Sequence, residues 1–367
     1  MLFAPADAPR LVIKIGSALL VDRDGGIRRD WLASIVDDIA SRISAGQQIA
    51  IVSSGAIALG ARRLTLGKGG RAHLEDAQAA AAVGQIALAQ AWSELLGRRS
   101  LPAAQILLTL GDLEDRRRYL NAAATLRRLL GLGAVPVINE NDSVATEEIR
   151  FGDNDRLAAR VAQAAGASAL VLLSDVDGLY EADPTNNPAA RHVPRVERIE
   201  AVADMAAAGS SSGMGSGGMR SKIAAARIAT AAGIPLAIAS GRVDHPLGPE
   251  RRHTLFVAER GASARKAWLA GGLTAAGTIC IDAGAADALA AGGSLLAAGV
   301  LAVEGDFARG DLITIEGGSG PVARGLAEYD AVEVRALAGR RSDEHAAILG
   351  YAPRSAVVHR NQLALLR

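Results

Sequence analysis

The stretch AVPVINENDSVATEEIRFGDNDRLAARVAQAAGASALVLLS, residues 134–174, decides the fold class. It opens with an apolar run at 134–139, crosses a polar loop and continues with helical periodicity over 155–165. Gly166-Ala167 then ends the helix, and a second apolar run follows at 169–174. Both runs are continuously apolar rather than alternating, as is typical of strands buried on both faces. The stretch therefore predicts a strand–helix–strand unit of a parallel sheet.

The same unit recurs on both sides of this stretch. Further strand-like runs occupy 11–15, 49–53, 103–108 and 234–239, separated by helical patterns at 30–45, 55–66, 75–96, 119–131 and 221–232. This alternation predicts an α/β fold, a three-layer αβα sandwich with a mainly parallel sheet. In such sheets ligands bind beyond the carboxyl ends of the strands, so we expect the chemistry in the segments that follow them.

The pattern changes after about residue 262. Short strands with frequent glycine turns and one short helix near 284–292 predict a small β-barrel-like domain. We therefore expect a first domain at 1–262, a linker at 263–275 and a second domain at 276–367. The second domain holds eight arginines, no lysine and eleven acidic residues, a net charge of −3.

Composition excludes several classes of protein. A net charge of +1 over 367 residues gives no electrostatic reason to expect a nucleic acid partner. The single cysteine, Cys280, cannot form an internal disulfide, and the six histidines show no i, i+3 or i, i+4 pair that would suggest a metal site. No apolar stretch is long enough for a transmembrane helix, and the N-terminus lacks the order of a signal peptide, so we expect a cytoplasmic protein without a membrane partner.

Two strand ends carry residues suited to an anion. LVIKIGSALL (11–20) places Lys14 in a strand that leads into a Gly-Ser turn, and IVSSGAIALG (51–60) places Ser53 and Ser54 before a helix. A lysine in a buried strand is costly unless it meets an anion, and helix-start amides attract one. The alternatives are a lysine that extends to solvent from an edge strand and an ordinary serine N-cap.

The segment between 137 and 162 is unusually rich in carboxylates and amides. Besides Glu147 and Glu148, seven such residues occur at the two ends of a seventeen-residue stretch: Asn139, Glu140, Asn141, Asp142, Asp153, Asn154 and Asp155. Capping a helix requires one of them, whereas a site for a small zwitterion would use carboxylates for its ammonium group and amides for its carboxylate. The alternative is a solvated, turn-rich loop.

A glycine-rich run precedes the last helix of the first domain. GMGSGGMRSK (213–222) ends with Lys222 in the first helical turn, an arrangement suited to a nucleotide phosphate. GMGSGG fits a dinucleotide-binding pattern, and GSSSG (209–213) fits a nucleophile elbow, but neither follows a strand. No P-loop motif occurs. Ser174 ends the 169–174 strand and Asp175 follows it, at the place where a nucleotide or its metal would be met.

Together these parts favour phosphoryl transfer. They supply two lysines, glycine-rich helix starts and a polar cluster, without a histidine base, a cysteine nucleophile or a metal cage. Phosphoryl transfer depends mainly on positioning and charge neutralisation. If the acceptor is a carboxylate, no general base is required, because the nucleophile is already ionised at neutral pH.

In order and spacing, LVIKIGS, IVSSGAIALG, PVINENDSVAT, FGDNDRLAA, SDVDGLYEADP and GSGGMRSK resemble the amino acid kinase family. EGDFARGDLITI and AILGY in the tail resemble a PUA domain. Within the family, the INEND and GDND pair resembles the members that phosphorylate the side-chain carboxylate of L-glutamate, in the first step of proline biosynthesis. The resemblance implies ATP as the donor and Mg²⁺ bound mainly through the ATP phosphates.

The resemblance also implies a role for each matching residue. Lys14 would meet the phosphates, Lys222 would stabilise the transferring group, and Asp155 would organise both lysines. Glutamate would be held by Ser54, Asp142 and Asn154. The ATP site would be lined by Lys14, Ser174, Asp175, Ser216, Gly217, Gly218, Met219, Arg220, Ser221 and Lys222. Ser174 and Ser216 stand where the family commonly has threonine, and both keep the hydroxyl.

The partners that the resemblance implies are L-glutamate, a homo-oligomer (dimer or tetramer), feedback inhibition by L-proline, and hand-over of the product to glutamyl phosphate reductase. PUA domains often bind RNA, but the charge of −3 and the absence of lysine oppose RNA binding by this tail. The alternatives are a sibling kinase acting on another carboxylate, carbamate or UMP, an RNA-binding factor built on the PUA-like tail, and a catalytically silent amino-acid sensor.

Overall fold

The computed structural model describes residues 2–22, 26–144, 154–184, 186–202, 218–248, 251–258 and 275–366. Contacts divide the chain into two compact units, 1–115 with 121–259 and 116–120 with 260–367. Apart from residue 275, the predicted linker lies outside the described residues, and so do Asp153, Ser216 and Gly217. The domain boundaries stay a prediction.

The first unit is built on an eight-stranded sheet in the order β3-β4-β2-β1-β5-β9-β10-β8. Its strands are β1 (Arg10–Ile15), β2 (Gln48–Ser53), β3 (Ala103–Leu108), β4 (Val135–Glu140), β5 (Ala169–Ser174), β8 (Arg195–Val196), β9 (Leu236–Ser240) and β10 (His253–Phe256). All neighbours pair in parallel except β9 and β10. The six strands predicted from the sequence form β1–β5 and β9, which confirms the mainly parallel α/β sheet.

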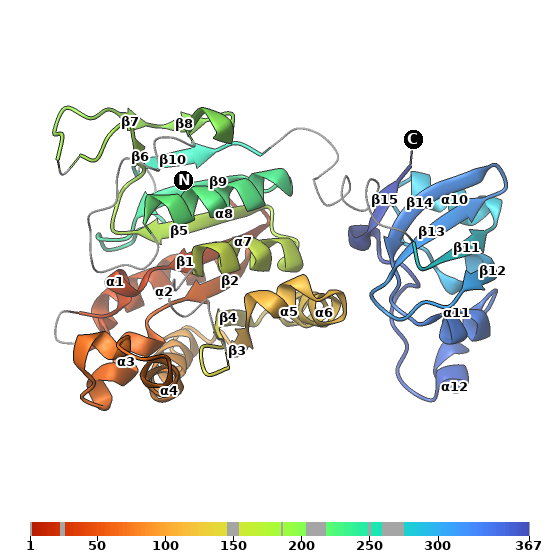
Figure 1. Cartoon of the computed structure of the whole chain (residues 1–367), viewed down its shortest axis with the longest axis horizontal. Helices are drawn as coiled ribbons and strands as arrows, with labels where there is room; N and C mark the ends of the chain where they lie inside the picture. The colour runs from red at the N-terminus through yellow and green to blue at the C-terminus, as the bar shows by residue number, and fades with distance from the viewer. Residues whose placement is uncertain are drawn as a thin grey trace. The chain divides into compact units, whose positions relative to one another are not determined.

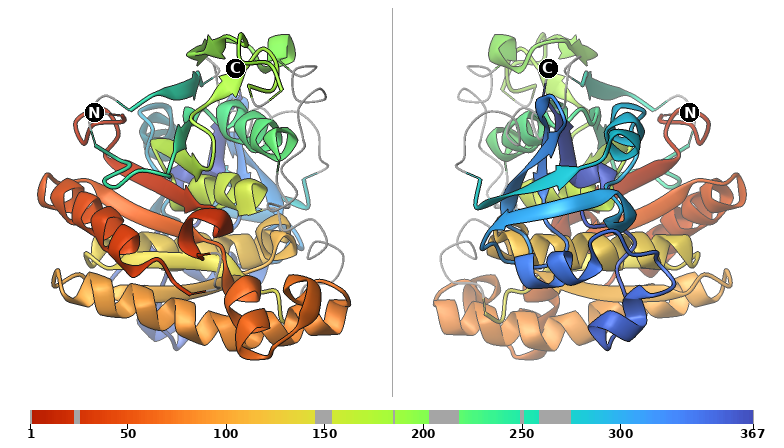
Figure 2. Two further views of the ribbon diagram at one scale, coloured as in Figure 1. Left: turned by 90° about the vertical axis from the view of Figure 1, so that its left-hand side faces the viewer. Right: turned by 90° about the vertical axis from the view of Figure 1, so that its right-hand side faces the viewer.

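Helices cover both faces of this sheet (Figures 1 and 2). They are α1 (Ser17–Leu20), α2 (Arg29–Ser44), α3 (Ala56–Arg63), α4 (Leu74–Gly97), α5 (Leu110–Glu114), α6 (Arg116–Gly131), α7 (Asn154–Ala165) and α8 (Met219–Ala231). α2 and α4 share a core cluster with one face of the sheet, while α7 packs on β1, β2 and β5, with α8 beside it. The three-layer prediction is therefore correct.

Strand parity decides where Lys14 points. Leu11, Ile13 and Ile15 of β1 all lie in the core cluster shared with α2 and α4. Because successive side chains of a strand point to opposite faces, Lys14 lies on the face covered by α7 and α8. The first turns of those two helices carry Asp155 and Lys222.

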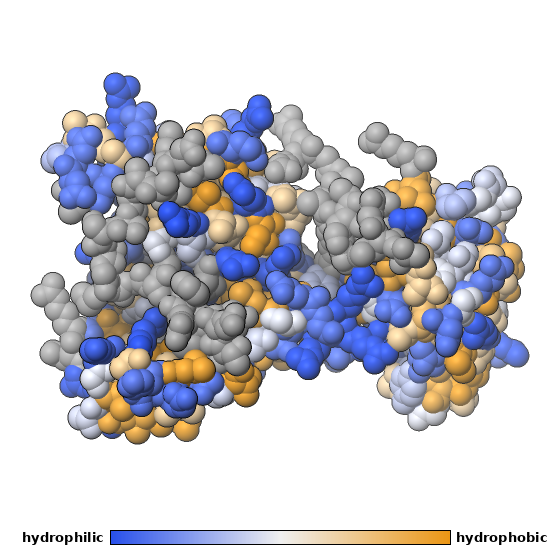
Figure 3. Space-filling model, viewed as in Figure 1, coloured by the Kyte–Doolittle hydropathy of each residue, from blue (hydrophilic) through white to orange (hydrophobic). Residues whose placement is uncertain are grey.

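Helices α3 and α4 cross at backbone contact. A Cβ on Gly60 would stand 1.7 Å from the carbonyl oxygen of Ala80, and one on Gly84 would stand 1.8 Å from that of Ala56. Glycine is therefore required at both positions. In Figure 3 apolar residues gather over α3 and α4, where Leu64 and Ile86 are exposed.

The second unit has its own five-stranded sheet and core. The sheet order is β12-β11-β13-β14-β15, formed by β11 (Gly277–Ile281), β12 (Val300–Gly305), β13 (Leu312–Gly317), β14 (Gly320–Leu326) and β15 (Leu363–Leu365). The predicted helix near 284–292 is α10 (Ala283–Ala290). Two further helices, α11 (Ala331–Leu337) and α12 (His345–Leu349), were not predicted, although Asp330 caps α11 and forms a capping box with Glu333 in its first turn.

The segment 175–200, whose three prolines predict a turn with a small excursion, contains three short strands. β6 (Leu179–Tyr180) and β7 (His192–Val193) form a small antiparallel pair, and β8 joins the edge of the main sheet through β10. None of the described helices is long and apolar enough to cross a membrane.

Candidate active site

Three charged side chains far apart in the sequence meet at the carboxyl ends of the central strands. Lys14 Nζ lies 2.5 Å from Asp155 Oδ1, and Lys222 Nζ lies 3.1 Å from Asp155 Oδ2. All three residues are buried, with 8%, 1% and 7% of the surface of Lys14, Asp155 and Lys222 exposed. We call this group the lysine–aspartate trio. The structure thus brings together the three residues that the sequence analysis singled out for catalysis.

The trio is held in a defined charge state. Burial would raise the pKa of the Asp155 carboxyl, but the charges and hydrogen bonds of Lys14 and Lys222 together hold it below its ordinary value. One carboxylate and two ammonium groups carry a single net positive charge. A buried excess cation is suited to an anionic ligand, whose charge would neutralise it.

A cluster of amides and hydroxyls lies beside the trio. Asn154 Nδ2, on the first residue of α7, donates to Ser54 Oγ at 2.7 Å and to Asn139 Oδ1 at 3.4 Å. Asn154 is 8% exposed, and no described residue donates a hydrogen bond to its Oδ1. The cluster therefore presents a buried acceptor that a ligand donor can satisfy.

Asp142 follows β4 by two residues and is also buried, with 8% of its surface exposed. Burial raises the pKa of its carboxyl from an ordinary value of 3.8 to about 6, while the charge of Arg71 acts in the opposite direction. No hydrogen bond to this carboxylate occurs among the described residues. A buried carboxylate in this state is stabilised by a cationic ligand group.

Ser53 departs from its prediction. The sequence analysis expected the hydroxyls of Ser53 and Ser54 to face an anion together. Ser53 Oγ is instead fully buried and accepts a hydrogen bond from Trp92 Nε1 at 3.1 Å. Gly55, with a left-handed φ of 108°, then turns the chain into α3, so only Ser54 joins the polar cluster.

The residues predicted to bind the nucleotide lie at the carboxyl end of β5 and at the start of α8. Ser174 Oγ donates to Asp175 Oδ1 at 3.0 Å, and Asp175 Oδ2 lies 3.7 Å from Arg242 Nη2. Gly218 precedes α8, whose first turn holds Met219, Arg220, Ser221 and Lys222. A helix N-terminus offers backbone N–H donors to a phosphate, and Lys222 lies within that turn.

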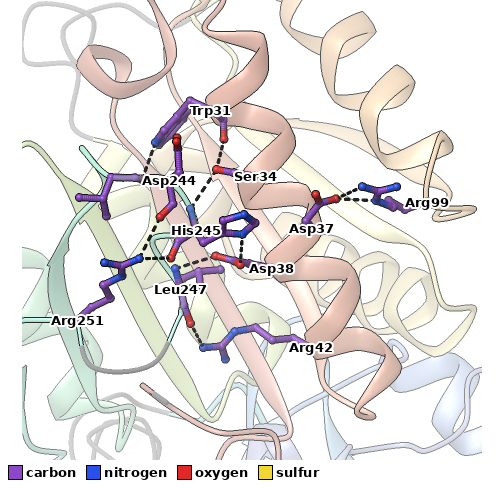
Figure 4. Close-up of polar contacts among 11 residues, drawn as sticks. Trp31, Ser34, Asp37, Asp38, Arg42, Arg99, Asp244, His245, Leu247 and Arg251 are labelled. Carbon is purple, nitrogen blue, oxygen red and sulfur yellow. Dashed lines mark hydrogen bonds and ion pairs between the residues drawn. The ribbon is translucent and has the colours of Figure 1, made fainter.

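Hydrogen bonds join residues 241–247, which include Arg242, to α2 (Figure 4). Trp31 Nε1 donates to the carbonyl of Gly241 at 2.7 Å, and Asp38 accepts from the backbone N–H of Leu247 at 3.0 Å. Arg42 donates to the carbonyl of Leu247 at 3.0 Å. Further bonds join Ser34 to the N–H of His245, and His245 Nδ1 to Asp38 at 2.9 Å. We call residues 241–247 the strap.

The strap and one further residue, Gln85, were not predicted from the sequence. A signal for the strap was present, since Trp31, Ser34, Asp38 and Arg42 follow one another at helical spacing on one side of α2. Gln85 accepts a hydrogen bond from Asn139 Nδ2 at 2.7 Å. Nothing in the local pattern of α4 distinguishes Gln85 from the other glutamines of that helix.

Family models match both parts of the chain. The amino acid kinase family model matches residues 9–240, and the PUA domain model matches residues 277–349. A glutamate 5-kinase of Sphingopyxis alaskensis is 69% identical over 367 residues, covering 100% of both chains. The glutamate 5-kinase of Zymomonas mobilis is 59% identical, covering 99% of this chain and 93% of its own.

A third relative, glutamate 5-kinase 1 of Rhizobium meliloti, is 56% identical and covers 97% of this chain and 92% of its own. These matches extend through both units. The chain belongs to the amino acid kinase family, among its glutamate 5-kinases, and carries a PUA domain after the kinase domain.

Proposed function

We propose that the chain transfers the γ-phosphoryl group of ATP to the side-chain carboxylate of L-glutamate, giving L-glutamyl 5-phosphate in the first step of proline biosynthesis. The observation that carries this proposal is the buried lysine–aspartate trio, which bears a net positive charge where strands β1 and β5 end. A phosphoryl group passing between two anions requires such a charge more than it requires a base.

The reaction itself is a direct displacement. A carboxylate oxygen of glutamate attacks the γ-phosphorus, the bond from that phosphorus to the β-phosphate oxygen breaks, and ADP leaves. Because a carboxylate is ionised at neutral pH, no proton has to be removed. Lys14 and Lys222 neutralise the charge that spreads over the phosphoryl oxygens, and Asp155 keeps both ammonium groups at the site.

The polar cluster is suited to the amino-acid end of glutamate. Asn154 Oδ1 and the Asp142 carboxylate are acceptors that lack a described donor, and the α-ammonium group supplies both charge and donors. Ser54 Oγ accepts from Asn154, so its own hydroxyl hydrogen remains for a substrate carboxylate. These three residues hold the substrate while the trio acts on its far end.

ATP binds through Lys14, Ser174, Asp175 and the segment 216–222, of which Gly218–Lys222 lie within the described residues. The described residues contain no group of three or more histidine, cysteine, aspartate or glutamate side chains placed to hold a metal. Mg²⁺ would be carried mainly by the ATP phosphates, and there it would supply neutralisation of their charge. Both Asp155 oxygens contact lysines, so we assign no metal ligand to that residue.

The family also supports proposals about partners. We propose a dimer or tetramer, feedback inhibition by L-proline at the glutamate site, and hand-over of the reactive acyl phosphate to glutamyl phosphate reductase. RNA binding by the PUA domain is opposed by its net charge of −3 over 276–367.

The test is ADP release with Mg·ATP and hydroxylamine, with L-glutamate, L-aspartate, N-acetylglutamate, carbamate and UMP in parallel. We expect turnover with L-glutamate alone and a trapped hydroxamate, which reports an acyl phosphate. Turnover with another acceptor would overturn the assignment of Asp142 and Asn154. Absence of turnover with every acceptor would favour a silent amino-acid sensor.

A further inference from the structure

A line of hydrogen bonds runs from α4 into the amino-acid site. Gln85 Oε1 accepts from Asn139 Nδ2 at 2.7 Å, and Asn139 Oδ1 accepts from Asn154 Nδ2 at 3.4 Å. The other hydrogen of Asn154 Nδ2 goes to Ser54 Oγ at 2.7 Å. Four side chains, from α4, β4, α7 and the turn after β2, are thus joined in sequence, and only the last two belong to the substrate-binding set.

The direction of each bond determines which atom reaches the substrate. A side-chain amide has an acceptor end and a donor end, and turning it over exchanges them. Asn139 directs Nδ2 to Gln85, which turns its Oδ1 toward Asn154, where it accepts from Nδ2. Asn154 then uses both N–H groups within the protein and leaves Oδ1 as the atom without a described donor.

The start of this line is held in place by backbone packing. Gly84, the neighbour of Gln85, lets α4 approach the first turn of α3, because any side chain there would meet the carbonyl oxygen of Ala56. Ala56 lies two residues after Ser54. Gln85 is therefore fixed relative to the far end of the same hydrogen-bond line.

We propose that Gln85 is a positioning residue for substrate specificity: by accepting from Asn139, it orients both asparagine amides so that Asn154 presents a carbonyl oxygen to the substrate ammonium group. The proposal rests on the proposed glutamate site. Gln85 acts through Asn139 and does not itself touch the substrate. The site consequently selects an amino acid over a dicarboxylic acid that lacks the amino group.

The discriminating variants differ in their ability to accept a hydrogen bond. Gln85→Glu keeps an acceptor at the same place, whereas Gln85→Met keeps the approximate volume and removes it. Gln90 lies on the same helix and is exposed, so Gln90→Met is the matched control. Each variant is assayed for KM and kcat with L-glutamate, with ATP and with glutarate, the analogue without the amino group.

We expect Gln85→Met to raise KM for L-glutamate about three- to tenfold, the worth of one neutral hydrogen bond, with KM for ATP unchanged. The ratio of kcat/KM for glutamate over glutarate should fall by the same factor. Gln85→Glu should retain the wild-type ratio, and so should Gln90→Met. A role confined to supporting the fold would lower the unfolding temperature without changing this ratio.

An unchanged glutamate-to-glutarate ratio in Gln85→Met, with wild-type turnover intact, would overturn the proposal. If Gln85→Met does not fold, Gln85→Leu and thermal protection by L-glutamate replace it, and equal protection in variant and wild type would also overturn the proposal. Failure of the proposed function looks different, because the wild-type protein itself would then give no hydroxamate with L-glutamate.

Discussion

Replacing Asp142 by asparagine should have opposite effects on stability and on substrate binding. The carboxylate is buried, has no described hydrogen-bond donor, and has a pKa raised by burial to about 6. At pH 8 the folded protein therefore keeps an ionised group in an unfavourable environment. Asparagine has nearly the same shape without the charge, so Asp142→Asn should stabilise the free protein.

The pKa shift sets the size of this effect. A rise from 3.8 to about 6 is about 2 units, and each unit corresponds to about 1.4 kcal/mol, so the charge costs at most about 3 kcal/mol above pH 6. Since the folded pKa is the higher one, the folded state binds the proton more tightly. The cost is full above pH 6, falls as the pH falls through 6, and vanishes below 3.8. The extra stability of the Asp142→Asn variant over the wild type should depend on pH in the same way.

Substrate binding should change in the other direction. If the Asp142 carboxylate pairs with the α-ammonium group, its loss removes one partner of a buried charge pair, worth about 2 kcal/mol or more. KM for L-glutamate should then rise at least about 30-fold, while KM for ATP is unchanged. In the wild type, KM for glutamate should itself rise as the pH falls through about 6, because protonation neutralises the carboxylate.

Tryptophan fluorescence provides the assay. Trp31 and Trp92 are buried in the first unit and report its unfolding. At pH 8 we expect an increase in melting temperature of up to roughly 6–12 °C, shrinking to zero near pH 4. Asp37→Asn is the control, because Asp37 is an exposed partner of Arg99 and its loss should change stability by less than about 1 kcal/mol.

Two results would refute this reasoning. A less stable Asp142→Asn protein at pH 8 would mean that the carboxylate makes stabilising interactions as an anion. A pH-independent difference between variant and wild type would mean that the effect comes from packing and not from the charge.

Lys222→Met should lower kcat at least about 100-fold with little change in KM for glutamate, and a loss confined to KM would contradict its role on the transferring group. Asp155→Asn leaves two buried ammonium groups without their shared carboxylate, so unfolding should become easier by about 3–5 kcal/mol, and a change below 1 kcal/mol in fluorescence melts would contradict this. Asp38→Ala removes the α2 carboxylate that accepts from the Leu247 N–H of the strap, so the free energy of unfolding should fall by about 1–3 kcal/mol. KM for ATP should rise, because the strap carries Arg242, which pairs with Asp175. An unchanged KM for ATP would exclude that coupling.

Much of the first unit could be predicted from the sequence because its signals are local. Buried parallel strands appear as continuous apolar runs, and Gly133, Gly166 and Gly233 end three helices with left-handed φ of 75°, 64° and 77°. The members of the trio were found by other signals: Lys14 lies in a strand before a Gly-Ser turn, Lys222 follows a glycine-rich run, and the role of Asp155 is implied by the family resemblance. The short elements were missed because two-residue strands such as β6 carry no periodicity.

The polar side of α2 is visible in the sequence, but its partner segment 241–247 and the partner of Gln85 could not be predicted, because both contacts join segments far apart in the chain. Asp38 and Leu247 are 209 positions apart, and Gln85 and Asn139 are 54 apart. A helix with a polar side looks solvent-exposed in sequence, whether that side meets water or a backbone segment. Whether the polar side of a helix meets water or a backbone segment depends on how the layers of the fold pack together.

Some side chains of the site are therefore placed by local rules of strand and helix, and others by contacts between distant segments. The charges of the trio are placed by rules that act within one element: strand parity directs Lys14, and helix starts place Asp155 and Lys222 at the same edge of the sheet. Any sequence with this alternation of strands and helices brings those groups together. The orientation of the Asn154 amide, by contrast, depends on Gln85 of α4 through its hydrogen bond with Asn139 of β4. We therefore expect substitutions in α4 to alter substrate choice while the phosphoryl-transfer charges stay in place.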